Sequence, residues 1–310
     1  MKGYHLRDVH LLLADRNRDI RDSVKGCFLE TGFGTVSATD TVADLANWIS
    51  EGKPDLLIAE IDLADGDLCE LFSGVRHHRV GGNPFLLIIA ISTSGDLPTV
   101  RKVIDTGADD LLVKPISVEI LFERITALIR SRKPFVVTSD YIGPTRRKKM
   151  RAGPGVPLIE APNPLQAKAL RRGNAATIQR QITAAIGEIN EQKMERHADR
   201  IMSLVERIVG DEADALDGRG HDGHLAQLLE VAEDLSRRMI DTRFVHISHL
   251  CRSLIQVTTA LIRAGHNRDP RDVKVLPHLA EAIRAIFTEE RDTSVFARDV
   301  SESVDRLAAK

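Results

Sequence analysis

The chain has 310 residues, of which 43% are hydrophobic and 28% charged, and its formal net charge at pH 7 is −2. This length exceeds what one hydrophobic core usually organises, so the sequence predicts two domains. The balanced charge excludes the overall basic excess that is typical of proteins held to nucleic acid or membranes by charge.

The cysteines and the apolar runs predict the cellular compartment. Cys27, Cys69 and Cys251 are odd in number and far apart, with no metal-ligand spacing. Such cysteine usage is typical of a reducing cytosol. The first residues lack the apolar length of a signal peptide, and no later run is long enough to span a bilayer. We therefore expect a cytoplasmic protein without a membrane span.

Residues 9–131 alternate short apolar runs with stretches whose apolar residues recur at helical spacing. The runs predict strands over residues 9–14, 35–38, 56–60, 85–92 and 110–113. The intervening stretches predict helices over residues 19–30, 41–51, 68–77, 97–106 and 117–131. Strict strand–helix alternation is typical of a doubly wound parallel sheet. The sequence therefore predicts an α/β domain with a five-stranded parallel sheet over residues 1–131.

Polar side chains stand at the ends of four of these strands. Asp15 follows the first strand. Glu60 is the last residue of the third strand and comes directly after the apolar run LLIA. Ser92 closes the fourth strand and Lys114 follows the fifth. Because the carboxyl ends of parallel strands meet at one edge of the sheet, where ligands bind, we expect these four groups to converge there.

Four stretches of this domain carry a family resemblance: LLLADRNRDIR, PDLLIAEIDLADGD, FLLIIAIST and GADDLLVKPIS. Through them, residues 6–131 resemble the receiver (CheY-like) domain of bacterial response regulators. The resemblance implies a flavodoxin-like fold in a two-component phosphorelay, in which an Asp at the end of the third strand accepts a phosphoryl group from a histidine kinase. It also implies an acidic pair that binds Mg²⁺, and a Ser or Thr and a Lys that contact the phosphoryl oxygens.

The resemblance carries over to some of these positions and fails at others. Ser92 and Lys114 match the family pattern, and Asp15 matches the first acidic position. Three positions depart from the pattern: Glu60 at the phosphoacceptor, Arg16 at the second acid, and Leu111 at the aromatic switch position.

These departures predict a degenerate phosphoacceptor site. The extra methylene of Glu60 displaces its carboxylate by roughly an ångström, which can cost about a hundredfold in rate. Arg16 replaces an oxygen ligand with a cation, so Asp15 and the backbone carbonyl of Asp62 would bind Mg²⁺ only weakly, and we expect no other cofactor. Our hypothesis is that the Arg16 guanidinium replaces the metal by bridging Asp15 and Glu60, while Lys114 holds the other side of Glu60. The alternative is an ion pair without regulatory meaning.

Residues 132–163 are rich in proline, glycine and basic residues. Such a composition predicts an irregular linker. The basic run 146–149 could contact nucleic acid or acidic lipid, but no aromatic interleaving accompanies it, so we favour contact with the acidic front domain.

Residues 164–310 show helical periodicity and no strand pattern. They predict a long amphipathic helix over 165–209, shorter helices over 225–239, 244–264 and from 270, and a last amphipathic piece that includes Val295, Phe296, Val300, Val304 and Leu307. A helix as long as the first usually needs a partner along its apolar seam. We therefore expect an all-α helical bundle for output or dimerisation, and a homodimer through its first helix.

Two histidines of the bundle are candidates for phosphotransfer. His249 lies in ISHLCRSL, which faintly resembles the histidine kinase motif, but no acidic residue follows it. His197, in KMERHADR, lacks the flanking residues of a phosphotransfer domain. For both histidines, we favour an imidazole that is exposed or that lies along the seam between helices, without a role in phosphotransfer.

The sequence thus predicts a response-regulator-like signalling protein, not an enzyme, that acts through protein–protein interaction. Histidine kinases or other signalling proteins are its expected partners, and nucleic acid is disfavoured. The alternative is a working phosphorelay member with a helical, phosphotransfer-like C-terminal domain. A third interpretation, a DNA-binding regulator, requires a basic helix-turn-helix that the near-neutral rear region does not offer.

Overall fold

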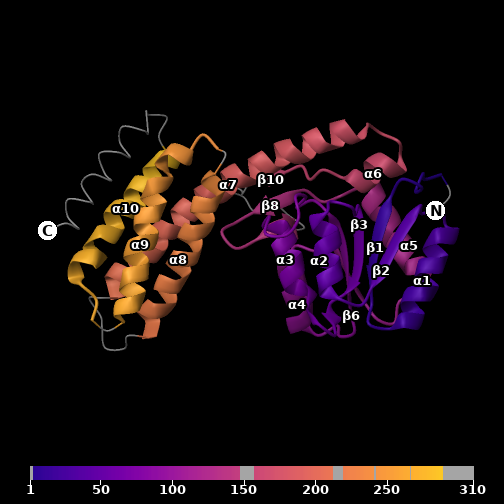
Figure 1. The fold of residues 1–310 in the computed structure, drawn as a ribbon, viewed down its shortest axis with the longest axis horizontal. Coiled ribbons are helices and arrows are strands. Elements are labelled where there is room, and N and C mark those ends of the chain that lie inside the picture. The colour runs from indigo at the N-terminus through magenta and orange to yellow at the C-terminus, as the bar shows by residue number, and fades with distance from the viewer. Residues whose placement is uncertain (1–2, 147–156, 212–218, 241, 266, 289–310) are drawn as a thin grey trace. The chain divides into compact units, whose positions relative to one another are not determined.

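The computed structural model describes the chain except for residues 1–2, 147–156, 212–218, 241, 266 and 289–310 (Figure 1). It divides into two compact units, Met1–Ile189 and Asn190–Lys310. The division falls inside one helix, α7 (Ala175–Asp211).

The first unit is built on a five-stranded parallel sheet, as the alternation predicted. The order is β2-β1-β3-β6-β7, and the bounds are β1 (His10–Ala14), β2 (Thr35–Thr39), β3 (Leu56–Glu60), β6 (Leu87–Ser92) and β7 (Asp110–Val113). A small antiparallel pair, β4 (Asp62–Leu63) and β5 (Gly66–Asp67), follows β3. The strand order reverses direction between β1 and β3, the position at which open α/β sheets bind their ligands.

Five helices cover the two faces of this sheet (Figure 1). Each begins at a polar residue whose side chain accepts a backbone N–H of the first turn, which satisfies donors that the helix leaves free. The helices, each with its capping residue, are α1 (Arg18–Glu30, Asn17), α2 (Val42–Ser50, Thr41), α3 (Leu68–Arg76, Asp67), α4 (Leu97–Asp105, Asp96) and α5 (Val118–Arg130, Ser117).

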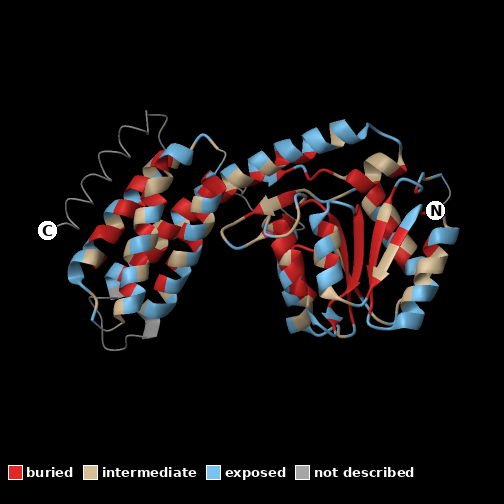
Figure 2. Ribbon diagram, viewed as in Figure 1, coloured by how far each residue is buried: buried red, intermediate tan, exposed pale blue. Residues whose placement is uncertain are grey.

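Alternate residues of each strand feed two separate cores. Leu11 and Leu13 of β1 pack with residues of α1 and α5, whereas Leu12 and Ala14 pack with residues of α2, α3 and α4. Figure 2 shows the central strands buried throughout. The period of two in the side-chain direction explains why both faces of a parallel strand are apolar.

Residues 132–163 differ from the irregular linker that the composition predicted. Within its described part lie β8 (Phe135–Val137), β9 (Ile142–Pro144) and β10 (Leu158–Ile159), which form an antiparallel sheet in the order β10-β8-β9. Proline falls only at the end of a strand or outside it, which a short sheet tolerates. Phe135 and Ile159 are buried with Phe85 of the receiver-like domain and with Ile182 and Ile189 of α7. The boundaries proposed for the linker stay a prediction.

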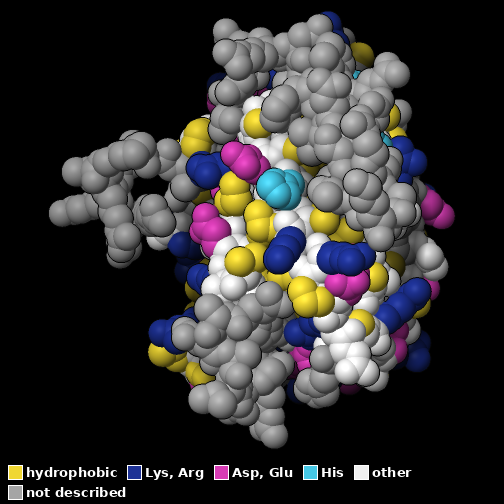
Figure 3. Space-filling model, turned by 90° about the vertical axis from the view of Figure 1, so that its left-hand side faces the viewer, with side chains coloured by type: hydrophobic (Ala, Val, Ile, Leu, Met, Phe, Trp, Pro, Cys, Tyr) yellow, Lys and Arg dark blue, Asp and Glu magenta, His cyan; other side chains and the backbone are white. Residues whose placement is uncertain are grey.

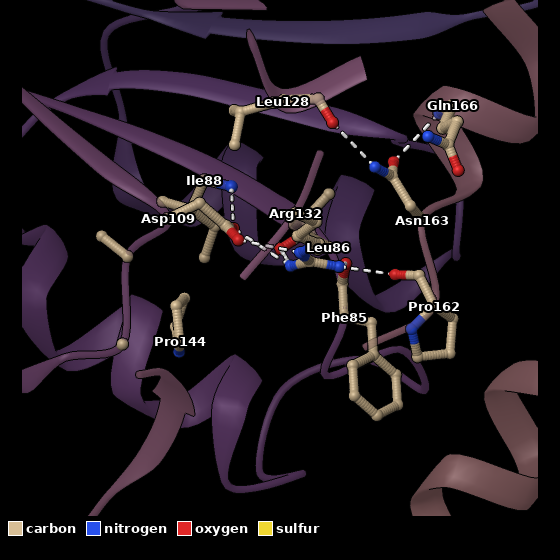
Figure 4. Close-up of polar contacts among 12 residues, drawn as sticks. Phe85, Leu86, Ile88, Asp109, Leu128, Arg132, Pro144, Pro162, Asn163 and Gln166 are labelled. Atoms are coloured by element: carbon tan, nitrogen blue, oxygen red, sulfur yellow. Dashed lines mark hydrogen bonds and ion pairs between the residues drawn. The ribbon is translucent and has the colours of Figure 1, made fainter. Parts of the chain in front are cut away.

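Buried charge fastens this small sheet to the five-stranded sheet (Figure 4). Arg132 donates to Asp109 Oδ1 at 2.8 Å and to the carbonyl oxygens of Phe85 and Pro162 at 2.7 and 2.6 Å. Arg76 donates to Asp109 Oδ2 at 2.9 Å, and the two guanidinium groups lie 5.3 and 4.9 Å from the Phe135 ring centre. We call Arg76, Asp109 and Arg132 the anchor cluster.

A polar residue at the end of the same segment joins two helices. Asn163 accepts from the Gln166 N–H at the start of α6 (Pro164–Ala169) and donates to the Leu128 carbonyl near the end of α5, at 2.9 and 2.8 Å (Figure 4). One side chain thus satisfies the start of one helix and the end of another.

The long helix predicted over 165–209 is interrupted. α6 ends at Ala169 and α7 begins at Ala175, because Arg171 and Gly173 take positive φ values of 50° and 84° between them. Residues in the left-handed region end a helix. Asn174 then accepts from the Thr177 N–H at 2.8 Å and starts α7.

The second unit is helical, as predicted. After α7 come α8 (Arg219–Met239), a short 3₁₀ turn η1 (Val245–Ile247), α9 (Ser248–Ala264) and α10 (Pro270–Thr288). One apolar core joins residues of α7, α8, α9 and α10, including Ile201, Leu228, Leu254 and Leu279. The last amphipathic piece predicted, around residues 295–307, lies outside the described residues. None of the helices that the structure describes has both the length and the apolar character to cross a membrane.

Candidate functional site

Four elements of the sheet bring the predicted polar residues to one edge. Asp15 follows β1, Glu60 ends β3, Ser92 ends β6 and Lys114 follows β7. The parallel arrangement places all four strand ends on the same side of the sheet. The side chains of Asp15, Glu60 and Lys114 meet there, whereas Ser92 bonds within its own turn. We call Asp15, Arg16, Glu60 and Lys114 the pocket cluster.

Lys114 is the cation that joins the two buried carboxylates. Its Nζ lies 2.7 Å from Asp15 Oδ2 and 3.1 Å from Glu60 Oε1. The carboxylate side chains are 3% and 0% exposed, whereas the lysine side chain is 23% exposed. Burying two carboxylates together is costly unless a cation lies between them, so Lys114 stabilises both.

Arg16 contacts Glu60, in a way that differs from the bridge we hypothesised. Its backbone N–H donates to Glu60 Oε2 at 3.2 Å, and its Nε lies 3.4 Å from Glu60 Oε1. Among the described residues, the cation that reaches both Asp15 and Glu60 is Lys114 and not Arg16, whose side chain is 57% exposed. Glu60 Oε1 accepts no well-directed hydrogen bond from the described residues, so charge rather than hydrogen bonding holds it.

Asp15 is held further by residues that sequence reasoning missed. Its Oδ1 accepts the Asn17 N–H at 2.8 Å, and its carbonyl accepts from Arg21 Nη1 at 2.6 Å. Arg21 also pairs with Asp40 at 3.0 Å. Asn17 is both a turn residue and the cap of α1, a combination that turn chemistry could have indicated.

Three other predicted residues have different surroundings. The Ser92 hydroxyl donates to the Ser94 carbonyl at 2.8 Å and accepts the Ser94 N–H at 3.1 Å, so it closes its own turn. Asp62 lies in β4 with an exposed side chain. Leu111 is half-buried against the core beneath α2, α3 and α4.

Carboxylates of the loop after β3 bond to residues of three helices, α2, α3 and α4. Asp65 accepts the Val42 N–H at the start of α2, at 2.8 and 2.9 Å. Asp67 accepts the Cys69 N–H and an ammonium hydrogen of Lys102. Partial burial alone would raise the pKa of Asp67, but these two hydrogen bonds outweigh it and lower the pKa. The loop is therefore ordered by its own acidic residues.

The residues present do not fit a magnesium site. Asp15 gives one oxygen to Lys114 and the other to the Asn17 N–H, and Glu60 lies against two cations. In the part of the chain that the structure describes, no three His, Cys, Asp or Glu side chains gather as metal ligands. Mg²⁺ requires several unpaired oxygens in near-octahedral geometry. Weak Mg²⁺ binding, with no other cofactor, stays a prediction.

The two histidines considered for phosphotransfer have different surroundings. His197 is 3% exposed, and its Nε2 lies 2.7 Å from Asp234 Oδ2, which Arg238 also contacts at 2.8 Å. Burial lowers the pKa of His197, although the hydrogen bond to Asp234 acts in the opposite direction. His249 is half-buried, and its Nδ1 lies 3.1 Å from the His246 carbonyl oxygen. Of the two, His197 lacks the exposure that phosphoryl transfer from another protein requires.

Similarity to known proteins identifies the family of the first domain. Residues 11–126 match the family model described as the response regulator receiver domain. The chain is 32% identical over 127 residues to the response regulator MprA of Mycobacterium tuberculosis (strain H37Rv), which covers 41% of this chain and 53% of that protein. The MprA proteins of Mycobacterium leprae and Mycobacterium avium match with the same identity and coverage.

Solved structures match a similar share of the chain. The chemotaxis protein CheY4 of Vibrio cholerae aligns with 19% identity and a TM-score of 0.35, over 38% of this chain and 97% of that chain. A two-component response regulator from Clostridium difficile aligns with 25% identity and a TM-score of 0.36, over 39% and 96%.

Residues 11–126 are therefore a response regulator receiver domain, a module of two-component signalling. The chain spans about half the length of the curated relatives that it matches. The family match ends at residue 126 and does not extend to the helical region 164–310.

Proposed function

We propose that this chain is a response-regulator-like protein whose receiver domain signals without phosphorylation, as a pseudo-receiver. The observation that carries the proposal is Lys114 Nζ, held between Asp15 Oδ2 and Glu60 Oε1 at 2.7 and 3.1 Å. The charge that would neutralise an incoming phosphoryl group is already neutralised by residues of the chain itself.

The charge balance of the pocket cluster supports this proposal. Asp15 and Glu60 supply two negative charges, and Arg16 and Lys114 supply two positive charges. Phosphoryl transfer depends almost entirely on positioning and on neutralising charge. A transferred phosphoryl group would add negative charge that this cluster lacks a cation to offset. We infer that the Glu60 carboxylate holds the domain in one signalling state.

The accessibility of Glu60 is a second support. Its side chain is 0% exposed, and a nucleophilic carboxylate must meet the phosphorus in line with the leaving group. The Glu60 carboxylate lies between Arg16 and Lys114, which in this proposal leaves no such approach. Glu60 is thereby a structural charge in this proposal and not an acceptor.

The output is proposed to be protein–protein contact rather than catalysis. Expected partners are a histidine kinase or other signalling proteins in the cytoplasm, and a second copy bound through the C-terminal helices. Figure 3 shows a face on which basic, acidic and hydrophobic side chains of the described residues are interspersed, a mixture more typical of a protein partner than of nucleic acid.

Intact mass after incubation of the full chain with acetyl phosphate and Mg²⁺ tests the proposal. We expect the mass to stay unchanged, while a receiver domain with an aspartate acceptor gains one phosphoryl group in parallel. Mg²⁺-dependent labelling of Glu60 or of a neighbouring carboxylate would refute the proposal. Labelling of His197 or His249 by a kinase or phosphotransfer donor would instead favour the phosphorelay alternative.

A further inference from the structure

A serine and a histidine of the receiver sheet lie side by side, away from the pocket cluster. His10 is the first residue of β1, and Ser37 lies in β2, the strand at one edge of the sheet. The two strands pair in parallel, with Leu12 opposite Ser37. Because side chains alternate along a strand, His10 shares a face of the sheet with Leu12 and lies diagonally across from Ser37.

The distance between the two side chains is short enough for proton transfer. His10 Nε2 lies 3.0 Å from Ser37 Oγ. A general base must lie about 2.6–3.2 Å from the atom whose proton it takes. Both residues are half-buried, so each keeps part of its surface open to solvent. The pair therefore combines the geometry of a nucleophile and its base with access from solution.

The backbone of Lys53 decides which nitrogen of His10 carries the proton. His10 forms a hydrogen bond with this backbone, and the bond acts to raise the pKa of the imidazole. A bond that favours the protonated ring is one in which the ring donates, so the Lys53 carbonyl is the acceptor. A neutral imidazole has one donor and one acceptor nitrogen. Nε2 is therefore the acceptor, and the Ser37 hydroxyl donates to it.

Burial keeps His10 in the form that takes up a proton. It is the largest influence and lowers the pKa of His10. The Lys53 backbone and the Asp55 carboxylate raise the pKa, whereas the ammonium groups of Lys168 and Lys53 lower it. The result is a pKa below the ordinary value of 6.5. At neutral pH the imidazole is therefore mostly an uncharged base.

Two cations lie near the pair. Lys168 Nζ lies 2.7 Å from Asp55 Oδ2, and the same oxygen accepts the His10 N–H at 2.9 Å. The Lys53 ammonium pairs with Glu51. Both ammonium groups act on His10 by charge, so positive charge is present beside the imidazole. Fixed positive charge stabilises the oxyanion that forms when a nucleophile attacks a carbonyl group.

We propose that Ser37 is a covalent modification site, a nucleophile that His10 activates and that accepts an acyl group from a thioester. Ser37 Oγ forms a bond to the acyl carbon, and its proton passes to His10 Nε2. The bond from the acyl carbon to sulfur then breaks, and His10 gives the proton to the leaving thiolate. A hydroxyl beside an oriented base is the arrangement that makes serine reactive. The site does not depend on how the pocket cluster signals.

Reaction of the full chain with a fluorophosphonate tests this proposal, because the product on serine is stable. Ser37 Oγ displaces fluoride from phosphorus as it would displace a thiolate from an acyl carbon. Peptide mass spectrometry compares Ser37 with Ser50, an exposed serine of α2 whose hydroxyl donates to the Ala46 carbonyl at 2.7 Å. The reaction is repeated with His10→Gln, which keeps a hydrogen-bonding amide but no base, and with the unmodified chain unfolded in urea.

We expect Ser37 to react about a hundredfold faster than Ser50 in the folded chain, which is at the lower end of what a positioned base contributes. The difference should disappear in His10→Gln and in urea. Acetylation of Ser37 by a simple thioester, S-acetyl-N-acetylcysteamine, should show the same dependence on His10 and on folding.

Three results would overturn the proposal. Equal labelling of Ser37 and Ser50 in the folded chain would leave the pair as a structural hydrogen bond between two strands. Preferential labelling of Ser37 that persists in His10→Gln or in urea would show that the histidine is not its base. Labelling by the fluorophosphonate without acetylation by the thioester would exclude the acyl donor. Thermal melting shows whether His10→Gln folds, and if it does not, the comparison of the unmodified chain in buffer and in urea decides.

Discussion

The receiver sheet carries a buried charge cluster at each of its two edges, and the two clusters differ in how completely they are bonded. At the amino ends of β6 and β7, the anchor cluster exposes 0–3% of its side chains. At the carboxyl ends, the pocket cluster leaves Lys114 23% and Arg16 57% exposed.

The two clusters also differ in the pattern of their hydrogen bonds. Arg76 and Arg132 donate to Asp109 and to backbone carbonyls, so the anchor cluster forms a directed network. Glu60 Oε1 has two nearby cations but accepts no well-directed hydrogen bond from the described residues. Saturated buried networks specify a structure, whereas an under-bonded buried group is typical of a functional site. We therefore expect the anchor cluster to contribute more to stability, and we propose that signalling depends on the pocket cluster.

Removal of an arginine from the anchor cluster should have the largest effect. Arg132→Ala leaves Asp109 with less charge compensation in a buried site, which costs about 3–5 kcal/mol of unfolding free energy. Chemical denaturation of the full chain measures the loss. Arg124→Ala, whose side chain is 51% exposed and pairs with Asp110, is the control and should cost about 0–1 kcal/mol. Similar losses from the two variants would contradict the role assigned to the anchor cluster.

Removal of the lysine from the pocket cluster should have the next largest effect. Lys114→Met leaves Asp15 and Glu60 buried without their shared cation. Because the Lys114 side chain is partly exposed, we expect a loss of only about 2–3 kcal/mol of unfolding free energy. Glu60→Gln in the same chain should recover part of that loss, because it removes one of the uncompensated charges. A double-mutant cycle by chemical denaturation measures the coupling, and additive losses would show that Lys114 and Glu60 do not interact.

A smaller effect is expected from pH in the second unit. Burial lowers the pKa of His197 below its ordinary value of 6.5, although Asp234 raises it, while Lys193 and Arg238 lower it further. The unfolded chain therefore binds a proton near pH 6.5 that the folded bundle binds only at lower pH. Stability should fall as the pH drops below about 6.5, by at most about 1.4 kcal/mol per pH unit for this group.

Denaturant titrations of the full chain between neutral and mildly acidic pH measure this slope. His197→Gln keeps an amide near Asp234 but does not titrate, so its slope should be flatter. An unchanged slope in the variant would assign the pH dependence to other groups.

The smallest effect is expected from Arg16. Its side chain is 57% exposed and pairs with Glu60 at 3.4 Å, so Arg16→Gln should cost only about 0.2–1 kcal/mol by chemical denaturation. If Arg16→Gln lowered the unfolding free energy as much as Lys114→Met does, Arg16 would be a principal cation of the pocket, contrary to our assignment.

The receiver fold could be predicted from the sequence because each of its elements has a local signature. Apolar runs mark β3 and β6, and turn residues such as Asn17 and Asp67 mark where α1 and α3 begin. The convergence of Asp15, Glu60 and Lys114 followed from the geometry of parallel strands alone.

The rest could not be predicted, because it depends on contacts between distant residues. Lys114 and not Arg16 bridges the carboxylates, since side-chain reach is set by the tertiary fold and not by adjacency to Asp15. The sheet formed by β8, β9 and β10 could not be predicted from composition either, because Arg132 and Phe135 contact residues far away in the sequence, among them Phe85, Arg76 and Asp109.

Magnesium titration, followed by the backbone amide NMR signals of Arg16 and Asn17 in the full chain, tests the central claim most directly. Because Lys114 and Arg16 already compensate the pocket carboxylates, we predict no saturable shift of these two signals at millimolar Mg²⁺, and a measurable shift once Arg16→Asp supplies an oxygen ligand. A saturable shift in the unmodified chain would contradict the claim that the chain's own cations have replaced the metal.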